Sequence, residues 1–416
     1  MVPRQAAKLH NRLPQPLKTA QLALNGGTPV RRELLPYGHH EISDADVEAV
    51  SRALRSDWLT SGPMIGQFES AFASVAGAEH SIAVSNGTAA LHAAMFALGI
   101  GPGDEVIVPP MTFAASANAI VYQGGTPVFA DVDRETLLLD PDAVAEKITP
   151  KTRAVVAVDY TGQPCDYDAL RSAVSSRAKR RVAIVADACH ALGGRDRGRK
   201  VGSIADITAF SLHPVKHITT GEGGVTTTAD AELASRMRMF RNHGISSDHH
   251  QRSAQASWIY EISELGYNYR LTDIQCALGL SQLSRLDARI ARRQEIASAY
   301  TRAFGAIPEI KPLGLRKDVV HAYHLFVVQA DTSRLGCDRQ ALFAALRREG
   351  IGVNVHYIPV HLHPFYRQRF KTGPGLCRVA EAAYERILSL PMFPSMTERD
   401  VDDVIEAVTK VVAAFR

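Results

Sequence analysis

The sequence lacks the features that mark several large classes of protein. No apolar run in its 416 residues approaches the roughly 18 residues of a membrane-spanning helix. The five cysteines show neither paired nor metal-ligand spacing, which favours reduced thiols in a reducing compartment. The net charge is only +4 and no long basic stripe is present, so we expect no nucleic-acid partner. Together these absences predict a cytoplasmic protein without a membrane or nucleic-acid partner.

Signals for targeting and for metal binding are also lacking. The basic residues near the N-terminus are followed by no apolar core, so we expect no signal peptide and interpret residues 1–20 as a mobile arm. His249 and His250 lie in a polar stretch with no second ligand cluster nearby. That isolation favours a solvated loop over a metal site, and we expect no bound metal.

An alternation of strands and helices is the main feature that is present. Apolar residues make up 46% of the chain and charged residues 22%, which is ordinary for a globular enzyme. Between about residues 80 and 230, strand-like segments alternate with helical ones, and several strands are continuous apolar runs, as at residues 182–186. Such runs are typical of the α/β class, in which helices cover both faces of a mostly parallel sheet.

The length of the chain is sufficient for two domains. We predict a large α/β domain over residues 21–285 and a smaller C-terminal α+β domain over residues 286–416. Apolar residues at helical spacing predict one long helix from Thr272 to about Tyr300, and we place the boundary along it.

A single lysine lies in an unusual stretch at residues 211–224. Hydroxyl groups, histidines and a glycine cluster surround Lys216, and strand-like apolar segments stand on both sides. Most lysines are solvated surface charges. A lysine between two buried strands loses hydration, which lowers the pKa of its ammonium group and leaves an amine that attacks carbonyls. We therefore hypothesise that Lys216 carries pyridoxal phosphate (PLP) as a Schiff base, provided that suitable partners occur elsewhere.

Residues suited to the rest of this cofactor follow other predicted strands. Asp187 ends an apolar strand about 30 residues before Lys216 and is suited to pair with the pyridine nitrogen. The turn that holds Gly87 and Thr88 opens a helix, and the free N–H groups of a helix N-terminus bind phosphate. Ligands bind beyond the carboxyl ends of parallel strands, so we expect these residues to lie close together. Further candidates are a phosphate donor, Ser211, and two rings to lie against the cofactor, Phe113 and His190.

Each candidate also has a purely structural interpretation. Asp187 would be a helix cap, Phe113 a core residue and His190 a core histidine with satisfied hydrogen bonds. The turn at Gly87 would be an ordinary capped connection between a strand and a helix. The joint occurrence of these residues, in this order and at the strand ends of one sheet, favours the cofactor site.

The sequence also resembles a known family of enzymes. The segments that carry the resemblance lie at residues 85–92, 101–106, 112–113, 187–191, 211–216, 221–224 and 266–273. With these segments the chain is similar, from about Leu24 to its C-terminus, to the DegT/DnrJ family, the nucleotide-sugar aminotransferase branch of the fold-type-I PLP enzymes. Cys189 departs from the family pattern, in which alanine is usual at this position.

The resemblance implies a fold, a cofactor and a role for each candidate residue. It implies a fold-type-I PLP transferase that uses PLP, forms pyridoxamine phosphate in the half-reaction, and works as a homodimer with shared active sites. Lys216 would be the Schiff-base lysine and Asp187 the partner of the pyridine nitrogen. The other matches are phosphate contacts (Gly87, Thr88, Ser211), a ring-stacking aromatic (Phe113), a His/Gln position beside the cofactor (His190) and an asparagine that reaches the phosphate from the neighbouring subunit (Asn268).

The substrate is also suggested by resemblance. Residues 162–166, 213–224 and 264–270 look most like the enzymes of pseudaminic acid synthesis. That likeness implies transfer of an amino group from L-glutamate to C4 of a UDP-linked 4-keto-6-deoxy-N-acetylhexosamine. Residues 25–31 instead resemble family members that act on other ketones, so a 3-keto sugar and the cyclitol scyllo-inosose stay open as alternatives. Three residues are open between substrate contact and a structural role: Arg241, His324 and His356.

Two further function classes are disfavoured by particular features. A PLP-dependent sugar dehydratase of this family carries histidine in place of the lysine, whereas Lys216 is present. A regulatory or sensor protein with this fold would need a fused DNA-binding segment, and residues 1–20 are too short to form one.

Overall fold

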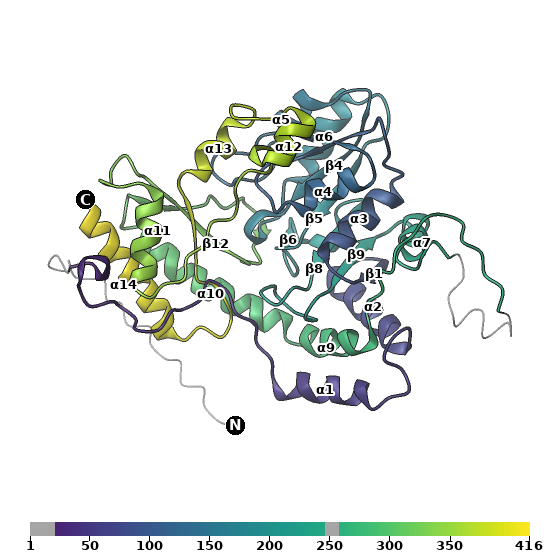
Figure 1. The fold of residues 1–416 in the computed structure, drawn as a ribbon, viewed down its shortest axis with the longest axis horizontal. Coiled ribbons are helices and arrows are strands. Elements are labelled where there is room, and N and C mark those ends of the chain that lie inside the picture. The colour runs from purple at the N-terminus through teal and green to yellow at the C-terminus, as the bar shows by residue number, and fades with distance from the viewer. Residues whose placement is uncertain (1–20, 246–257) are drawn as a thin grey trace.

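A seven-stranded sheet forms the centre of the larger part of this computed structural model, which describes residues 21–245 and 258–416 (Figure 1). Strand β9 pairs antiparallel with both of its neighbours, while all other neighbouring pairs are parallel. The mostly parallel sheet predicted from the apolar runs is therefore confirmed. Across the sheet the strands are β1 (His80–Val84), β9 (Gly224–Thr228), β8 (Ile207–Ser211), β5 (Ala183–Asp187), β4 (Thr152–Val158), β2 (Glu105–Val108) and β3 (Thr126–Phe129).

Helices cover both faces of this sheet because successive side chains of a strand point to opposite sides. Ile82 and Val84 of β1 belong to the main core, whereas Ala83 between them packs with Phe68 and Phe72 in a separate core. The helices of the main core are α3 (Gly87–Ala97), α4 (Ala115–Tyr122), α5 (Pro141–Lys147), α6 (Tyr167–Arg177) and α7 (Ala231–Phe240). The opposite face is covered by α2 (Pro63–Ala76), α9 (Asp273–Leu283) and the start of α10 (Leu286–Phe304).

The single long helix expected from Thr272 to about Tyr300 is wrong. The chain forms two helices, α9 and α10, which are separated at Ser284 and Arg285. The Ser284 hydroxyl donates to the carbonyl of Ser281 at 2.7 Å, and the Arg285 guanidinium is held by the Asp46 carboxylate. Side-chain bonds of this kind compete with the helical backbone pattern, which apolar spacing does not register. Asp46 itself belongs to α1 (Asp44–Leu54), whose expected cap by Ser43 is present.

A smaller antiparallel sheet lies beside the large one in Figure 1. It packs with α10 and two C-terminal helices around a second core. The predicted domain boundaries, by contrast, stay a prediction. The elements of this part are β10 (Ile310–Pro312), β12 (Phe326–Ala330), β13 (Ile387–Leu390), α11 (Arg339–Arg348) and α14 (Glu398–Phe415). Helices α12 (Pro364–Phe370) and α13 (Arg378–Tyr384) instead bury Tyr366, Ala380 and Ala383 in the main core and lie beside α5 and α6 in Figure 1.

Residues 22–37, here called the N-terminal strap, contact this second core. Leu22 and Leu35 are buried in it, and the strap ends at Tyr37, whose carbonyl accepts from the backbone N–H of Met392 at 3.0 Å. The predicted mobile arm at residues 1–20 and the predicted loop with His249 and His250 lie outside the described residues. Within residues 21–245 and 258–416, no helix has the length and apolar character needed to cross a membrane.

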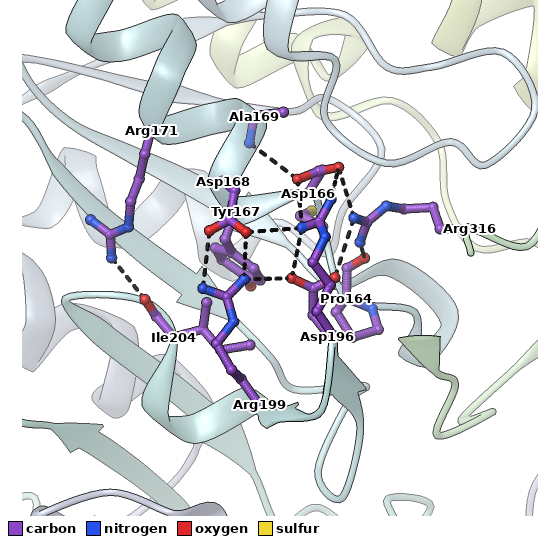
Figure 2. Close-up of polar contacts among 12 residues, drawn as sticks. Pro164, Asp166, Tyr167, Asp168, Ala169, Arg171, Asp196, Arg199, Ile204 and Arg316 are labelled. Atoms are coloured by element: carbon purple, nitrogen blue, oxygen red, sulfur yellow. Dashed lines mark hydrogen bonds and ion pairs between the residues drawn. The ribbon is translucent and has the colours of Figure 1, made fainter. Parts of the chain in front are cut away.

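A third, very small sheet connects distant parts of the chain. It joins the hairpin of β6 (Arg195–Asp196) and β7 (Arg199–Lys200) to β11 (Val319–Val320). Figure 2 shows the ion pairs around this hairpin: Arg199 contacts Asp168 at the start of α6 and the buried Asp196, and Arg316 contacts Asp166 and Asp196. Through Arg316, the segment before β11 is thereby attached to Asp166 at the start of α6, one of the helices that cover the large sheet.

Candidate active site

A cavity of about 1020 Å³ lies at the carboxyl ends of the parallel strands. Parallel strands end at the same edge of a sheet, so side chains far apart in sequence meet there. All of the predicted site residues except Asn268 line this cavity: Gly87 and Thr88 at the start of α3, Asp187 at the end of β5, Ser211 at the end of β8, and Phe113, His190 and Lys216 on the connecting segments.

The amine of Lys216 is surrounded by protein although the residue as a whole is partly exposed toward the cavity. Burial lowers the pKa of this amine, and the positive charge of Arg293 acts in the same direction. Cys189 and Asp187 oppose the shift in pKa without reversing it. The Nζ atom lies 3.3 Å from Nε2 of His324, within hydrogen-bond distance. The site therefore favours a lysine whose neutral form is available at lower pH than that of a solvated lysine.

The carboxylate of Asp187 is held in one orientation by two donors. Its Oδ2 atom accepts from the Ser116 hydroxyl at 2.6 Å, and its Oδ1 atom accepts from the backbone N–H of Cys189 at 3.2 Å. Ser116 stands in α4 and also contacts the Thr112 hydroxyl at 2.6 Å. A buried carboxylate that is fixed in this way is suited to face one defined positive or N–H group of a ligand.

The start of α3 forms a narrow cradle beside β8. Asn86 caps the helix, with its side chain accepting from the backbone N–H of Ala89 at 2.8 Å. A Cβ atom added to Gly87 would lie 2.9 Å from the Cβ atom of Ser211, so only glycine fits without displacement. Because free N–H groups and the helix dipole attract negative charge, the end of this 11-residue helix is suited to hold a phosphate group next to Ser211.

Aromatic rings and imidazoles line the remaining wall of the cavity. Phe113 is 62% exposed, so the interpretation of this ring as a core residue does not hold. Its centroid lies 6.0 Å from that of Tyr357, whose hydroxyl lies 3.2 Å from Nε2 of His190. The Nδ1 atom of His190 has no hydrogen-bond partner among the described residues. Burial lowers the pKa of His190 well below its usual value, and the charge of Lys216 adds to this effect.

Asn268 and Arg241 do not line the cavity, unlike the other candidates. Asn268 is exposed, and its backbone forms a bridge with Asn242. Arg241 forms an ion pair with Glu69 and donates to the carbonyl of Ala83 at 2.6 Å, which is a structural role. The other two open candidates, His324 and His356, both line the cavity.

Sequence reasoning missed several residues that line or support the cavity. Ser116 follows Thr112 by four positions, a spacing that places both hydroxyls on one side of a helix entrance and could have indicated a paired role. Tyr37 and Tyr357 carry no comparable signal, because each enters the cavity from a segment remote in sequence. Together the lining offers an amine, an oriented carboxylate, an anion-binding helix end and flat rings, which fit the needs of PLP.

Comparisons with known proteins agree with this arrangement. The model of the DegT/DnrJ/EryC1/StrS aminotransferase family matches residues 40–409. Spore coat polysaccharide biosynthesis protein SpsC of Bacillus subtilis (strain 168) is 44% identical over 384 residues, which cover 92% of this chain and 98% of that protein.

Two solved structures show the same fold over nearly the whole chain. Spr1654 from Streptococcus pneumoniae, provisionally a sugar aminotransferase and solved in its PMP form, has a TM-score of 0.86 and 32% identity, covering 92% of this chain and 100% of that one. Helicobacter pylori PseC, an aminotransferase involved in the biosynthesis of pseudoaminic acid, has a TM-score of 0.84 and 31% identity over 92% of this chain and 100% of that one. Spr1654 has also been solved in a PLP form.

Proposed function

The chain belongs to the DegT/DnrJ/EryC1/StrS aminotransferase family and is a PLP-dependent sugar aminotransferase, and on this premise we propose that it transfers an amino group from L-glutamate to C4 of a nucleotide-linked keto-deoxysugar. The observation that carries the proposal is the convergence of Lys216, Asp187 and the start of α3 on one cavity. A volume of about 1020 Å³ is enough for a cofactor together with a substrate. The substrate is suggested by the likeness to PseC, which is involved in pseudoaminic acid biosynthesis.

Each residue of the proposed site has a task that follows from its position. Lys216 would hold the cofactor through its amine, and Asp187 would keep the pyridine nitrogen protonated. When bound, PLP draws electrons away from the α-carbon of the amino donor, so that a proton leaves that carbon more easily. The Nζ atom of Lys216 would take this proton and, in the second half-reaction, deliver a proton to the former keto carbon of the sugar. The phosphate would be held by Gly87, Thr88 and Ser211, with Phe113 and His190 beside the ring.

The exposed position of Asn268 supports a homodimer with shared active sites. Ile262, Leu265 and Tyr267 lie just before Asn268 and are all exposed, with 81% of Leu265 accessible. A cluster of exposed apolar side chains on one segment favours coverage by another protein surface. We propose that a second copy of the chain covers it and receives Asn268 in its own cavity. Light scattering would show a dimer in solution, and a monomer would contradict the proposal.

The role of Lys216 is tested by replacing it with arginine. Lys216→Arg keeps a positive charge, but its guanidinium does not lose a proton, so it neither attacks a carbonyl nor relays a proton. We expect loss of turnover and of the absorbance band of the lysine-bound cofactor. Full activity in this variant would refute the assignment. Kinetics should be of the ping-pong type, because the keto acid leaves before the sugar binds.

The sugar and the position of amination are tested by a substrate panel. The pyridoxamine form of the enzyme is mixed with nucleotide-linked 4-keto and 3-keto sugars and with scyllo-inosose. We expect the absorbance band of the lysine-bound cofactor to return fastest with a UDP-linked 4-keto-6-deoxy-N-acetylhexosamine. A faster return with a 3-keto sugar or with scyllo-inosose would move the assignment to that substrate.

We also propose a cytoplasmic location, supported by five cysteines that are all free thiols.

A further inference from the structure

We propose that His324 is a positioning residue that holds the amine of Lys216 in its reactive place, and that residues 321–324, here called the histidine loop, are built to present it. The proposal rests on the proposed role of Lys216 as the amine of the reaction. The histidine loop connects β11 to β12 and so enters the cavity from the C-terminal part of the chain.

The ring of His324 contacts the lysine directly. Nε2 of His324 lies 3.3 Å from Nζ of Lys216, and only 4% of the residue is exposed. Burial lowers the pKa of His324 well below its usual value, and the nearby charge of Lys216 lowers it further. The imidazole is therefore neutral, and its Nε2 atom is suited to accept a hydrogen bond from the lysine amine. Among the described residues, no hydrogen-bond partner contacts the Nδ1 atom of the same ring.

Every backbone carbonyl of the histidine loop accepts a hydrogen bond from a side chain outside it. Gln294 donates to the first carbonyl at 3.1 Å, and His217 donates to the second at 3.0 Å. Arg293 donates to the third and fourth at 3.1 and 3.2 Å. Gln294 and Arg293 belong to α10, whereas His217 follows Lys216 directly in the chain. The loop is thus fixed from two separate elements, one of which carries the lysine.

The loop also packs against the segment after β4 at a distance that only glycine allows. The backbone N–H of Ala322 donates to the carbonyl of Gly162 at 2.9 Å. Gly162 has φ +108°, and a Cβ atom there would lie 2.8 Å from the backbone nitrogen of Tyr323. Tyr323 itself has φ +47°, which is uncommon for a residue with a side chain. Its N–H donates to Nδ1 of His321 at 2.8 Å, which stabilises this turn.

The chain that leads into the loop is held as well. Arg316 forms ion pairs with Asp166 at 2.8 Å and with the buried Asp196 at 3.3 Å, and donates to the carbonyl of Pro164 at 2.8 Å (Figure 2). These contacts attach the segment before the histidine loop to the chain that follows β4 and to the hairpin of β6 and β7. A loop held at its entry and at each of its carbonyls leaves the ring of His324 little freedom, and that precision is what positioning of a reactive amine requires.

The test compares His324→Phe, which keeps a flat ring without nitrogen, with His324→Gln, whose amide reaches the place of Nε2. We expect kcat of His324→Phe to fall about 100-fold while KM for glutamate changes less than about threefold, because misplacing a reactive group by about 1 Å costs that much. His324→Gln should recover to within about tenfold of the wild type. His361→Gln is the matched control, since His361 is also buried but pairs with Glu381 and does not line the cavity.

A second readout needs neither cofactor nor sugar. Cyanate reacts with neutral amines, so the pH midpoint of Lys216 carbamoylation, measured by peptide mass spectrometry on the cofactor-free protein, reports the state of this amine. Loss of the acceptor at His324 should lower this midpoint by about one pH unit in His324→Phe. The midpoint in His361→Gln should stay unchanged. The other titratable groups around the amine are the same in all variants: Asp187, Cys189, His190, His217, Arg293 and His356.

The two readouts separate this inference from the proposed function. A shifted midpoint in His324→Phe alone supports the inference even when no keto sugar is accepted. An unchanged midpoint overturns it, including the case in which kcat falls, because His324 would then act on the substrate instead. Melting curves confirm that the variants are folded. Should His324→Phe fail to fold, His324→Gln carries the test: kcat within about tenfold of the wild type supports the inference, because the amide restores the acceptor, and a larger loss of kcat overturns it.

Discussion

A buried ion pair contributes to the attachment of the N-terminal strap, beside the buried side chains of Leu22 and Leu35 and the ion pairs of Arg31 with Asp400 and Asp403. The carboxylate of Glu349 is fully buried and accepts from the backbone N–H groups of Ala23 at 2.8 Å and Val30 at 3.0 Å. The ammonium group of Lys410 in α14 lies 2.8 Å from the same carboxylate and also donates to the carbonyl of Thr28 at 2.8 Å. Replacing Lys410 with methionine keeps an unbranched apolar side chain without the ammonium group and removes both contacts.

The size of the effect follows from leaving a buried charge alone. Breaking a buried ion pair by removing one partner costs about 3–5 kcal/mol, because the remaining carboxylate has no compensating charge. Each 1.4 kcal/mol changes an equilibrium about tenfold, so detachment of the strap should become roughly 100- to 4,000-fold more frequent. In Glu349→Gln/Lys410→Met neither charge is left unpaired, and we expect a smaller increase than in Lys410→Met.

Limited proteolysis with trypsin measures this detachment, because Arg31 and Arg32 lie within the strap. When opening is fast compared with cleavage, the cleavage rate reports the open fraction. We expect cleavage at these two residues to accelerate strongly in Lys410→Met. Lys317→Met, at an exposed lysine, is the control and should be cleaved at the wild-type rate. Wild-type cleavage in Lys410→Met would refute the reasoning.

Two further predictions concern the large sheet. Burial raises the pKa of Asp159 to about 7, so the folded protein keeps a proton that the unfolded chain releases above about pH 4, and wild-type stability falls as pH rises from about 4 to 7. Asp159→Asn keeps a side-chain oxygen to accept from the Tyr167 hydroxyl, which lies 2.7 Å from Oδ1 of Asp159. The denaturant midpoint of this variant should therefore rise relative to that of the wild type between about pH 5 and pH 8. A difference between the two midpoints that does not change with pH would contradict this prediction. Gly87→Ala forces a contact of 2.9 Å with Ser211, so PLP affinity, measured by absorbance titration, should fall about 10- to 100-fold. Gly66→Ala is the control, since nothing lies within 4 Å of a Cβ atom there, and it should bind PLP with wild-type affinity. Unchanged affinity in Gly87→Ala would contradict the prediction, because Ser211 would then move aside without affecting the phosphate site.

Local patterns in the sequence were sufficient to predict the α/β class and most of the cavity. Continuous apolar runs indicated the parallel strands, and a parallel sheet brings its strand ends to one edge, so Asp187 and Lys216 could be placed together before their contacts were known. The helix break at Ser284 was missed because a hydroxyl bond to Ser281 leaves no trace in apolar spacing.

Contacts between segments remote in sequence were decided only by the tertiary structure. His324 stands 108 positions from Lys216, and its orientation depends on carbonyls held by α10, which no motif encodes. From the sequence alone, Glu349 and Lys410 are indistinguishable from ordinary surface charges, whereas in the structure both are buried where the strap packs. Backbone periodicity specifies which side of an element is apolar, whereas the pairing of one polar atom with another depends on where the whole chain places them. The amine of Lys216, the carboxylate of Asp187 and the start of α3 could therefore be predicted from the sequence, and the residues that orient them could not.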